Sequence, residues 1–257
     1  MKHYTTNRVV TALLCTTTAA LITGCGTDSS EPGVKSTVSA AKTKHPFDTM
    51  TAEQIDKQAR EAVRSTTSMR LTGTASSGGR QVEVDLAIDV RGSCNGTVGN
   101  SPGSIHIIKK GPLVYAKAGE DYWRATFSRG MTVAQTEEMV DHFKGRWIKP
   151  PQLMSETLGG FCDDFDSLLD VLSTEPDGNT TREADATVDG RPTAVLAERT
   201  TTETTTVYIA KEGKPYLLRA TIVGGDDPVD LTFTDHNKPV DTTPPPRDQI
   251  LDPTTLR

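Results

Sequence analysis

The ten residues QVEVDLAIDV, numbered 81 to 90, alternate between apolar and polar side chains with a period of two. The even positions carry Val82, Val84, Leu86, Ile88 and Val90, whereas the odd positions carry Gln81, Glu83, Asp85 and Asp89, with Ala87 the one neutral exception. Because successive side chains of a strand point to opposite faces, this pattern predicts an antiparallel strand with one buried and one wet face. The chain must therefore build a sheet and cover one side of it.

Similar short runs recur along the chain and are separated by turn-forming residues. We expect further strands at 69–74, 104–110, 113–118, 122–126, 193–199, 205–211, 216–223 and 229–235. Glycine-containing pairs mark the turns between them, and Asn95-Gly96 is interpreted as one of these turns. The order of strands predicts a large antiparallel meander.

Three segments have the spacing of amphipathic helices. In residues 50–65, Thr51 and Gln54 are placed as a capping box, and Ile55, Ala59, Ala62 and Val63 form one apolar stripe. The second helix is expected at 132–143, with Val133, Met139, Val140 and Phe143 on its inner face. The third is expected at 163–173, with Phe165, Leu168, Leu169 and Leu172 inside. Helices packed on one side of an antiparallel sheet make an α+β domain.

The first 24 residues have the marks of a secretory signal, with basic Lys2 and Arg8 before an apolar stretch from residue 9 to 24. The stretch is shorter than the roughly 20 mostly apolar residues of a transmembrane helix, and threonines dilute it. It ends in LITGC, which resembles the bacterial lipobox, whose cysteine is lipidated and becomes the first residue. An ordinary signal peptide is the alternative. We expect residues 1–24 to be a lipoprotein signal peptide, and Cys25 to anchor the protein to the extracytoplasmic face of the cell membrane.

The chain has four cysteines. Cys15 lies within the expected signal and Cys25 is the expected lipidation site, so Cys94 and Cys162 are the two that stay available in the mature protein. An even pair of cysteines in an exported protein favours a disulfide. Two buried free thiols, or a metal site, are the alternatives. The metal site is the weaker of these because no histidine or second cysteine lies at ligand spacing from either residue.

The chain carries 28 basic and 34 acidic residues, and without Lys2 and Arg8 the remaining 26 and 34 give a net charge of −8. Such a chain is a poor partner for nucleic acid and for anionic lipid, so the acyl anchor must hold it at the membrane. Residues 25–46 predict a lipidated, flexible tether, 47–240 a single domain, and 241–257 a proline-rich tail. In that tail, Ile250 and Leu251 are the expected anchoring side chains.

Signatures of enzymes are missing from the sequence. The four histidines after the signal, His45, His106, His142 and His236, stand at no triad or metal-binding spacing. The sequence has no Gly-x-Ser-x-Gly elbow, phosphate-binding loop or dinucleotide fingerprint. The acidic cluster of Asp163, Asp164 and Asp166 is better explained by a helix N-terminus than by catalysis or calcium. Trp123 and Trp147 either line a ligand mouth or simply pack, the latter being commoner. We expect no enzyme activity, no cofactor and no metal.

Over residues 50 to 240, the order of the segments and their residue composition resemble those of a known family. The lipobox and tether are followed by REAVRSTTSMRLTGT, GPLVYAKAGEDYWR, GRWIKP, FDSLLDVL and GKPYLLRA, and then by DLTFTDHNKPV near the end. Together these are similar to the actinobacterial LppX/LprG-type cell-envelope lipoproteins, which share the LolA-like half-barrel. The resemblance implies a large curved sheet wrapped over a few helices, around an apolar cavity that in studied members holds acyl chains. The Cys94 and Cys162 pair departs from the family pattern.

Two functions remain open at this point. In the first, the protein binds or carries a lipid or other amphiphile in a cavity lined by Val82, Val84, Leu86, Ile88, Leu218, Ile222 and Phe233. In the second, it is an extracytoplasmic sensing or adaptor domain, filled by its own side chains, that binds a protein partner of unknown identity. Inward-facing valines look alike around a ligand and around a helix, so the sequence does not separate the two.

Overall fold

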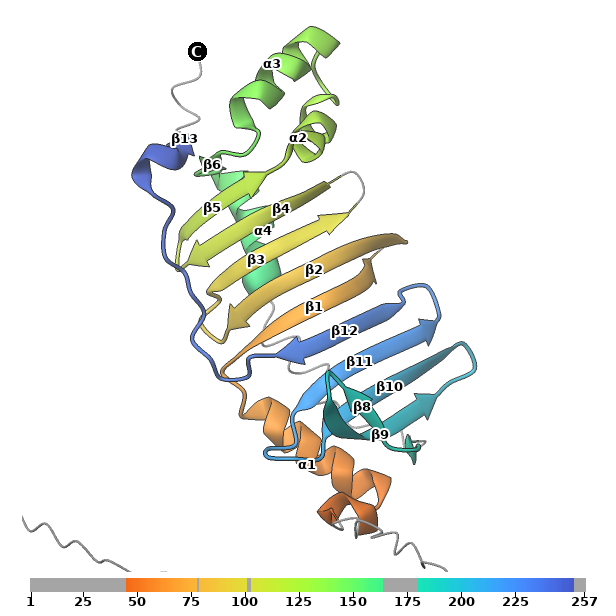
Figure 1. The fold of residues 1–257 in the computed structure, drawn as a ribbon. Helices are drawn as coiled ribbons and strands as arrows, with labels where there is room; N and C mark the ends of the chain where they lie inside the picture. The colour runs from red at the N-terminus through yellow and green to blue at the C-terminus, as the bar shows by residue number, and fades with distance from the viewer. Residues whose placement is uncertain (1–44, 78, 101–102, 164–179, 252–257) are drawn as a thin grey trace, which may run out of the picture. The chain divides into compact units, whose positions relative to one another are not determined.

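The computed structural model describes residues 45–77, 79–100, 103–163 and 180–251, which all belong to the compact unit Lys44–Arg257. In these residues the chain forms four α-helices and a thirteen-stranded sheet (Figure 1). The helices are α1 (Ala52–Arg64), α2 (Glu120–Phe127), α3 (Val133–Phe143) and α4 (Gln152–Asp163). The strands are β1 (Ser68–Ser77), β2 (Arg80–Asp89), β3 (Cys94–Asn100), β4 (Gly103–Lys110), β5 (Leu113–Ala118), β6 (Trp147–Ile148), β7 (Thr180–Arg182), β8 (Ala186–Val188), β9 (Arg191–Arg199), β10 (Glu203–Ala210), β11 (Leu217–Gly224), β12 (Val229–Thr234) and β13 (Ile250–Leu251).

The sheet is long, almost wholly antiparallel and unclosed. Its strand order is β13-β6-β5-β4-β3-β2-β1-β12-β11-β10-β9-β7, with β8 paired to β9 beside β7. Among the described strands, only the short β13–β6 pair is parallel. Strands β1 to β5 form one meander, and strands β9 to β12 form a second. The antiparallel pairing of β1 with β12 joins the two meanders into one sheet. The expected α+β fold with an open, half-barrel sheet is confirmed.

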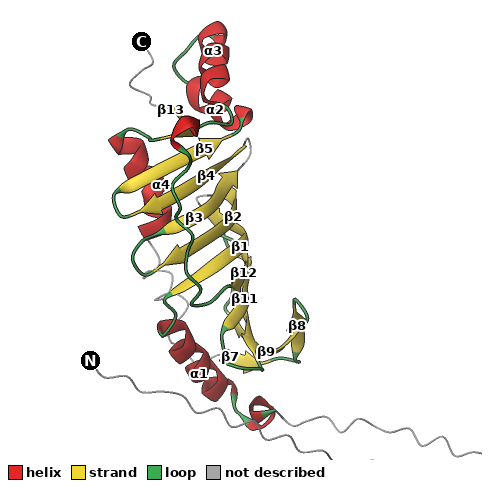
Figure 2. Ribbon diagram, turned by 60° about the vertical axis from the view of Figure 1, so that its left-hand side comes forward, coloured by secondary structure: helices red, strands yellow, loops and turns green. Residues whose placement is uncertain are grey.

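One face of the sheet, called the inner face here, carries the larger buried clusters. Helix α1 covers it over β9 and β10, where Ile55 and Ala59 pack with Leu196 and Ile209. Helices α2 to α4 cover its other end, where Trp123, Val140 and Leu158 join the main cluster. In Figure 2, α1 and α4 lie to one side of the sheet and β8 lies to the other. In the described part of the chain, β8 and the C-terminal segment each cover a part of the opposite, outer face.

Helix α1 begins as its sequence predicts. The Thr51 hydroxyl accepts the Gln54 amide N–H at 3.3 Å, and the Gln54 side-chain oxygen accepts the Thr51 amide N–H at 3.0 Å. This reciprocal capping box satisfies two amides that have no partner inside the helix. The predicted stripe of Ile55, Ala59, Ala62 and Val63 is fully buried.

Two glycines allow neighbouring strands to approach closely. A Cβ on Gly73 would lie 2.0 Å from the Asp230 carbonyl oxygen, and one on Gly96 would lie 2.0 Å from the Asp85 carbonyl oxygen. Gly73 also has a φ angle of 139°, which side-chain-bearing residues rarely adopt. Glycine within a strand commonly marks a bend or a close backbone approach, which suits a curved sheet.

Several predicted elements differ from the structure. Residues 122–126 belong to helix α2 and not to a strand, and Asn95-Gly96 lies inside strand β3 and not in a turn. Helix α4 was not predicted, whereas the helix predicted at 163–173 lies outside the described residues apart from its first residue. Val133, predicted to face inward, is 81% exposed, and Val90, which follows the last residue of β2, is 46% exposed.

The C-terminal strap, residues 235–251, runs back across the strand ends (Figure 1). The Asn237 amide donates to the Ser68 carbonyl at 2.8 Å, and the Ser68 hydroxyl donates to the Lys238 carbonyl at 2.6 Å. Further on, β13 pairs with β6, so Ile250 packs beside Trp147 and Leu251 reaches the main core. The prediction that these two side chains anchor the tail is confirmed.

Candidate functional site

Strand register aligns apolar side chains into rows across the inner face. One row crosses β2, β1, β12, β11, β10 and β9 as Val84, Gly73, Leu231, Ala220, Val207 and Leu196. The next row contains Val82, Ala75, Val229, Ile222, Thr205 and Glu198. From β2 to β10 each row spans roughly 19 Å, given about 4.8 Å between neighbouring strands.

Burial falls off from one end of these strands to the other. The row beneath the first contains Leu86, Leu71 and Phe233, which are only 3%, 7% and 1% exposed. The two rows described above instead carry six half-buried apolar side chains, which we call the apolar strip: Val82, Val84, Val207, Ile222, Val229 and Leu231. Four of its members, Val82, Val84, Val207 and Leu231, pack against the main cluster, and Val207 also packs against the cluster beneath α1. It gives the inner face an apolar surface that the protein's own side chains only partly cover.

The structure brings together six of the seven residues predicted to line a cavity. Val82, Val84 and Ile222 belong to the apolar strip, while Leu86, Ile88 and Phe233 form the buried floor next to it. Leu218 differs, because it packs with Val188 and Ala210 in a separate cluster. The register of β10 and β11 shifts between Tyr208 and Ile209, so Tyr208 faces Arg219 while Ile209 faces Leu217. This bulge leaves Leu218 unpaired and turns it to the outer face.

Three members of the strip, Val207, Val229 and Leu231, were not predicted as site residues. Each lies in a strand that was predicted correctly, and each has apolar neighbours at a spacing of two. What the sequence lacks is the pairing of β1 with β12, which places residues 71–75 beside residues 229–233. That pairing joins the first and last strands of two separate meanders.

An aromatic cluster fills the end of the inner face below α2 and α3. The Trp123 ring stacks on Phe127 at 5.6 Å between centroids and tilts against Phe143 at 5.3 Å. Trp123 is 1% exposed, and its indole N–H has no hydrogen-bond partner among the described residues. Burial also raises the pKa of Tyr122, whose ring meets Trp123 edge-on. Trp147 lies elsewhere, packed on the outer face with Ile108 and Tyr115.

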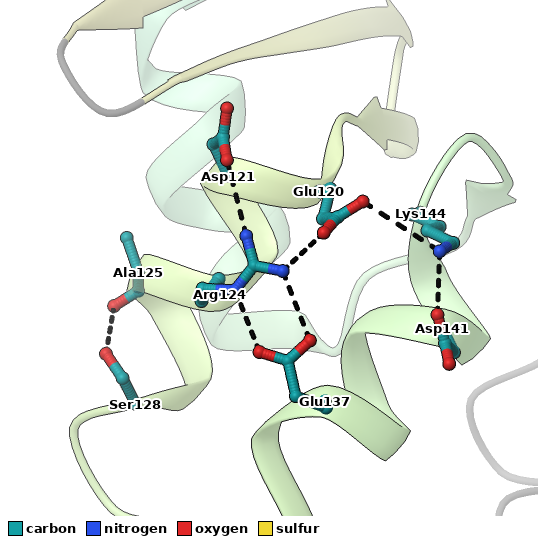
Figure 3. Close-up of polar contacts among 8 residues, drawn as sticks. All are labelled: Glu120, Asp121, Arg124, Ala125, Ser128, Glu137, Asp141 and Lys144. Atoms are coloured by element: carbon teal, nitrogen blue, oxygen red, sulfur yellow. Dashed lines mark hydrogen bonds and ion pairs between the residues drawn. The ribbon is translucent and has the colours of Figure 1, made fainter. Parts of the chain in front are cut away.

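A network of charged side chains ties α2 to α3 (Figure 3). The Arg124 guanidinium donates to both carboxylate oxygens of Glu137, at 2.9 and 3.1 Å, and also pairs with Glu120 and Asp121. Lys144 pairs with Asp141 at 2.7 Å and with Glu120 at 3.8 Å. Arg124 therefore holds the pKa of Glu137 below its usual value, chiefly through these hydrogen bonds. The pairs are solvent-exposed, so they orient the helices more than they stabilise the fold.

Cys94 and Cys162 form the expected disulfide, with their Cα atoms 5.5 Å apart. The bond joins the first residue of β3 to the last turn of α4, and both residues are fully buried in the main cluster. Beside it, Lys109 pairs with Asp163 of α4 and donates to the Gly92 carbonyl at 3.1 Å. The disulfide thus fixes α4 against the inner face.

Hollows lie on the outer face. One of about 580 Å³ lies between β8 and the sheet and is lined by Thr72, Asp189, Arg219 and Asp230, among others. A second, of about 440 Å³, lies under the strap and includes His106, Asn95 and the Arg70–Asp85 ion pair. The lining of the first hollow is mainly polar, which suits polar groups better than acyl chains.

The histidines do not form a catalytic arrangement. His106 Nε2 lies 2.7 Å from the Asn95 side-chain oxygen, and its ring packs edge-on against Trp147. Burial holds the pKa of His106 below 6.5, and burial lowers that of His236, stacked on Tyr216, to about 4. Across the described ranges, no three His, Cys, Asp or Glu side chains converge as metal ligands do. Within those same ranges, no helix has the length and apolar character needed to cross a bilayer.

An unclosed antiparallel sheet with helices on its inner face and a half-covered apolar strip defines a half-barrel of the α+β class. No protein-family model matches the chain, and no curated protein sequence matches it. Among solved structures, the chain is similar to LprF from Mycobacterium bovis, with a TM-score of 0.51 and 15% identity over 76% of this chain and 96% of LprF. The half-barrel fold expected from the sequence resemblance is therefore confirmed.

Two further structures align over similar lengths. The lipoprotein LppX of Mycobacterium tuberculosis has a TM-score of 0.43 and 15% identity, over 75% of this chain and 98% of LppX. An uncharacterized conserved protein from Thermus thermophilus has a TM-score of 0.31 and 11% identity, over 78% of this chain and 98% of that protein.

Proposed function

We propose that this protein is a membrane-anchored lipoprotein that binds or carries a lipid or another amphiphile on its inner face. The observation that carries the proposal is the apolar strip, a set of half-buried side chains from four strands, β2, β12, β11 and β10, with Gly73 and Ala75 of β1 between them. Contiguous apolar side chains that stay partly open to solvent often mark a site where a ligand or partner binds. The fold shared with LprF and the resemblance to LppX/LprG-type lipoproteins support the same class of ligand.

The binding mechanism is hydrophobic burial. An acyl chain lying along the strip would remove its own methylenes and the strip's methyl groups from water, at about 0.8 kcal/mol per methylene. Leu86, Leu71 and Phe233 form a packed floor beside the strip, which keeps its shape without a ligand. No bond is made or broken, and no cofactor is needed for this function.

Native mass spectrometry tests the proposal. Residues 26–257 should be exported behind an ordinary cleavable signal, so that the chain meets envelope lipids but carries no anchor of its own. We expect a population whose mass exceeds that of the polypeptide by one lipid, which collisional activation releases. A folded chain that shows only the polypeptide mass, and takes up no lipid from vesicles, would refute the carrier function. It would favour a sensing or adaptor domain with a filled core.

We propose that the membrane attachment is made by Cys25, with residues 26–46 as the tether. The expected result of Cys25→Ala is the loss of metabolically incorporated palmitate and release of the protein from the membrane fraction, because the acyl chains on Cys25 are the proposed anchor. Cys15→Ala, within the apolar stretch, is the matched control and should keep both properties. Retention of the Cys25→Ala protein in washed membranes would contradict this anchor.

A further inference from the structure

A hollow of about 440 Å³ lies at the opposite side of the strap from His106, where the β2–β3 turn meets the end of β4. Its lining includes Asp89, Val90, Arg91 and Ser93 of the turn and Lys110 of β4. The strap closes it with residues 237–240 and Thr242. It is separated from the apolar strip, since the strip residues stand at the other end of β2.

The walls of this hollow are fixed by hydrogen bonds. One carboxylate oxygen of Asp89 accepts the amides of Arg91 and Ser93, each at 2.9 Å. The Val90 amide donates to the Thr67 carbonyl at 3.0 Å, and the Thr67 amide donates to the Asn237 side-chain oxygen at 2.7 Å. Both the turn and the strap are thereby attached to the start of β1. A site whose walls are already ordered loses little entropy on binding.

Charge in the hollow is positive, although the chain as a whole is negative. Arg91, Lys110 and Lys238 line it against the single carboxylate of Asp89. Lys238 pairs with Asp235 at 2.7 Å, whereas Arg91 and Lys110 form no ion pair with any residue that the structure describes. The hydroxyls of Ser93 and Thr242 likewise make no hydrogen bond within the described ranges. Two cationic and two hydroxyl-bearing residues therefore line one hollow, and their side chains make no ion pair or hydrogen bond with the described residues.

We propose that this hollow binds a phosphate group. A guanidinium matches two phosphate oxygens at once, an ammonium supplies a second positive charge, and hydroxyls donate to the remaining oxygens. Val90, 46% exposed, and Pro239 give the hollow an apolar side that tolerates carbon next to the phosphate. The phosphate can belong to a phospholipid head group or to a small soluble molecule. The proposal does not depend on lipid carriage by the inner face.

Inorganic phosphate titrated into ¹⁵N-labelled Lys44–Arg257, the compact unit that contains every described element, tests the site by NMR. We expect saturable shifts of the Arg91, Gly92 and Ser93 amides, with a Kd on the order of 1 mM, as suits a small ligand held by a few charged contacts. Arg91→Gln with Lys110→Gln should weaken this binding about tenfold or more. Arg80→Gln with Lys57→Gln removes two exposed cations elsewhere and is the matched control.

Vesicles of phosphatidylcholine, with and without phosphatidylglycerol, distinguish a phospholipid head group from a small soluble phosphate compound as the ligand. Binding of the wild type to the anionic vesicles, lost in the double variant and kept in the control, would identify a lipid head group. Saturable binding of inorganic phosphate without vesicle binding would identify a soluble phosphate compound. Shifts that are linear in phosphate, or that are equal in the double variant and the wild type, would overturn the site. Both glutamine variants replace exposed side chains, so all proteins should give the same dispersed spectrum.

Discussion

Replacing Cys94 and Cys162 together with alanine should lower the free energy of unfolding by about 4 kcal/mol. The bond closes a loop with a sequence separation of 68 residues, and in the chain-entropy model a loop of that size restricts the unfolded chain by about this amount. Both sulfurs are fully buried, so the variant also loses packing around them. For a domain of this size the thermal midpoint should fall by about 10 °C.

Urea unfolding followed by far-UV circular dichroism measures the effect on Lys44–Arg257. The reduced wild type is the control, because it lacks the covalent bond but keeps both sulfur atoms. The free energy of unfolding of the reduced wild type should fall nearly as far as that of the double variant. The remaining difference between these two free energies reports the packing of the sulfur atoms alone. If the oxidised wild type and the double variant unfold within about 1 kcal/mol of each other, the bond does not constrain the unfolded chain as the model requires.

Much of the fold is predictable from local sequence pattern. The alternation of residues in β2 predicts a strand, and the capping box of α1 predicts where that helix begins. Both signals come from residues close together in the chain. Ile250 and Leu251 are predictable as anchors because they are adjacent apolar residues in a largely polar tail, although the strand that they pair with is distant in the chain. These predictions succeed because burial of one face and satisfaction of helix-end amides are requirements of the segment itself.

The wrong predictions have in common a tertiary contact that overrides local preference. Asn95-Gly96 is a strong turn signal, yet Gly96 lies within β3 because the Asp85 carbonyl approaches the place of its missing side chain. The aromatic residues of α2 favour a strand locally, but Trp123 stacks on Phe127 one helical turn later. Helix α4 contains Gly159 and Gly160, which lower its helix propensity, and it is held by packing and by the disulfide.

The candidate site was predictable in part for a related reason. Val82 and Val84 were found from alternation alone, whereas Val229 and Leu231 join them only through the β1–β12 pairing. Strict alternation from Ile222 would place Leu218 on the inner face. The bulge opposite Tyr208 breaks the alternation, and one extra residue in a strand reverses the face of those beyond it.

Ile222→Glu should remove most of the bound lipid, and Val223→Glu should leave it unchanged. Ile222 is half-buried in the apolar strip beside Val229, whereas Val223 is its chain neighbour, 68% exposed and pointing to the other face. A carboxylate at position 222 would have to lose water for an acyl chain to lie over it, and that cost opposes the gain from methylene burial. We expect lipid occupancy to fall about tenfold or more.

The two substitutions add the same charge to the same strand, so differences between them report the face and not the net charge. Ile222 is not part of the closed core, and the Glu variant should therefore remain folded, with a loss of stability of about 1–2 kcal/mol. Occupancy is measured by native mass spectrometry after identical export and purification, and folding by circular dichroism of the same samples. Equal lipid content in the two variants would place the ligand away from the strip, because only one of them changes the inner face. A loss confined to Ile222→Glu would make strand register, and not the sheet's total apolar content, the determinant of binding.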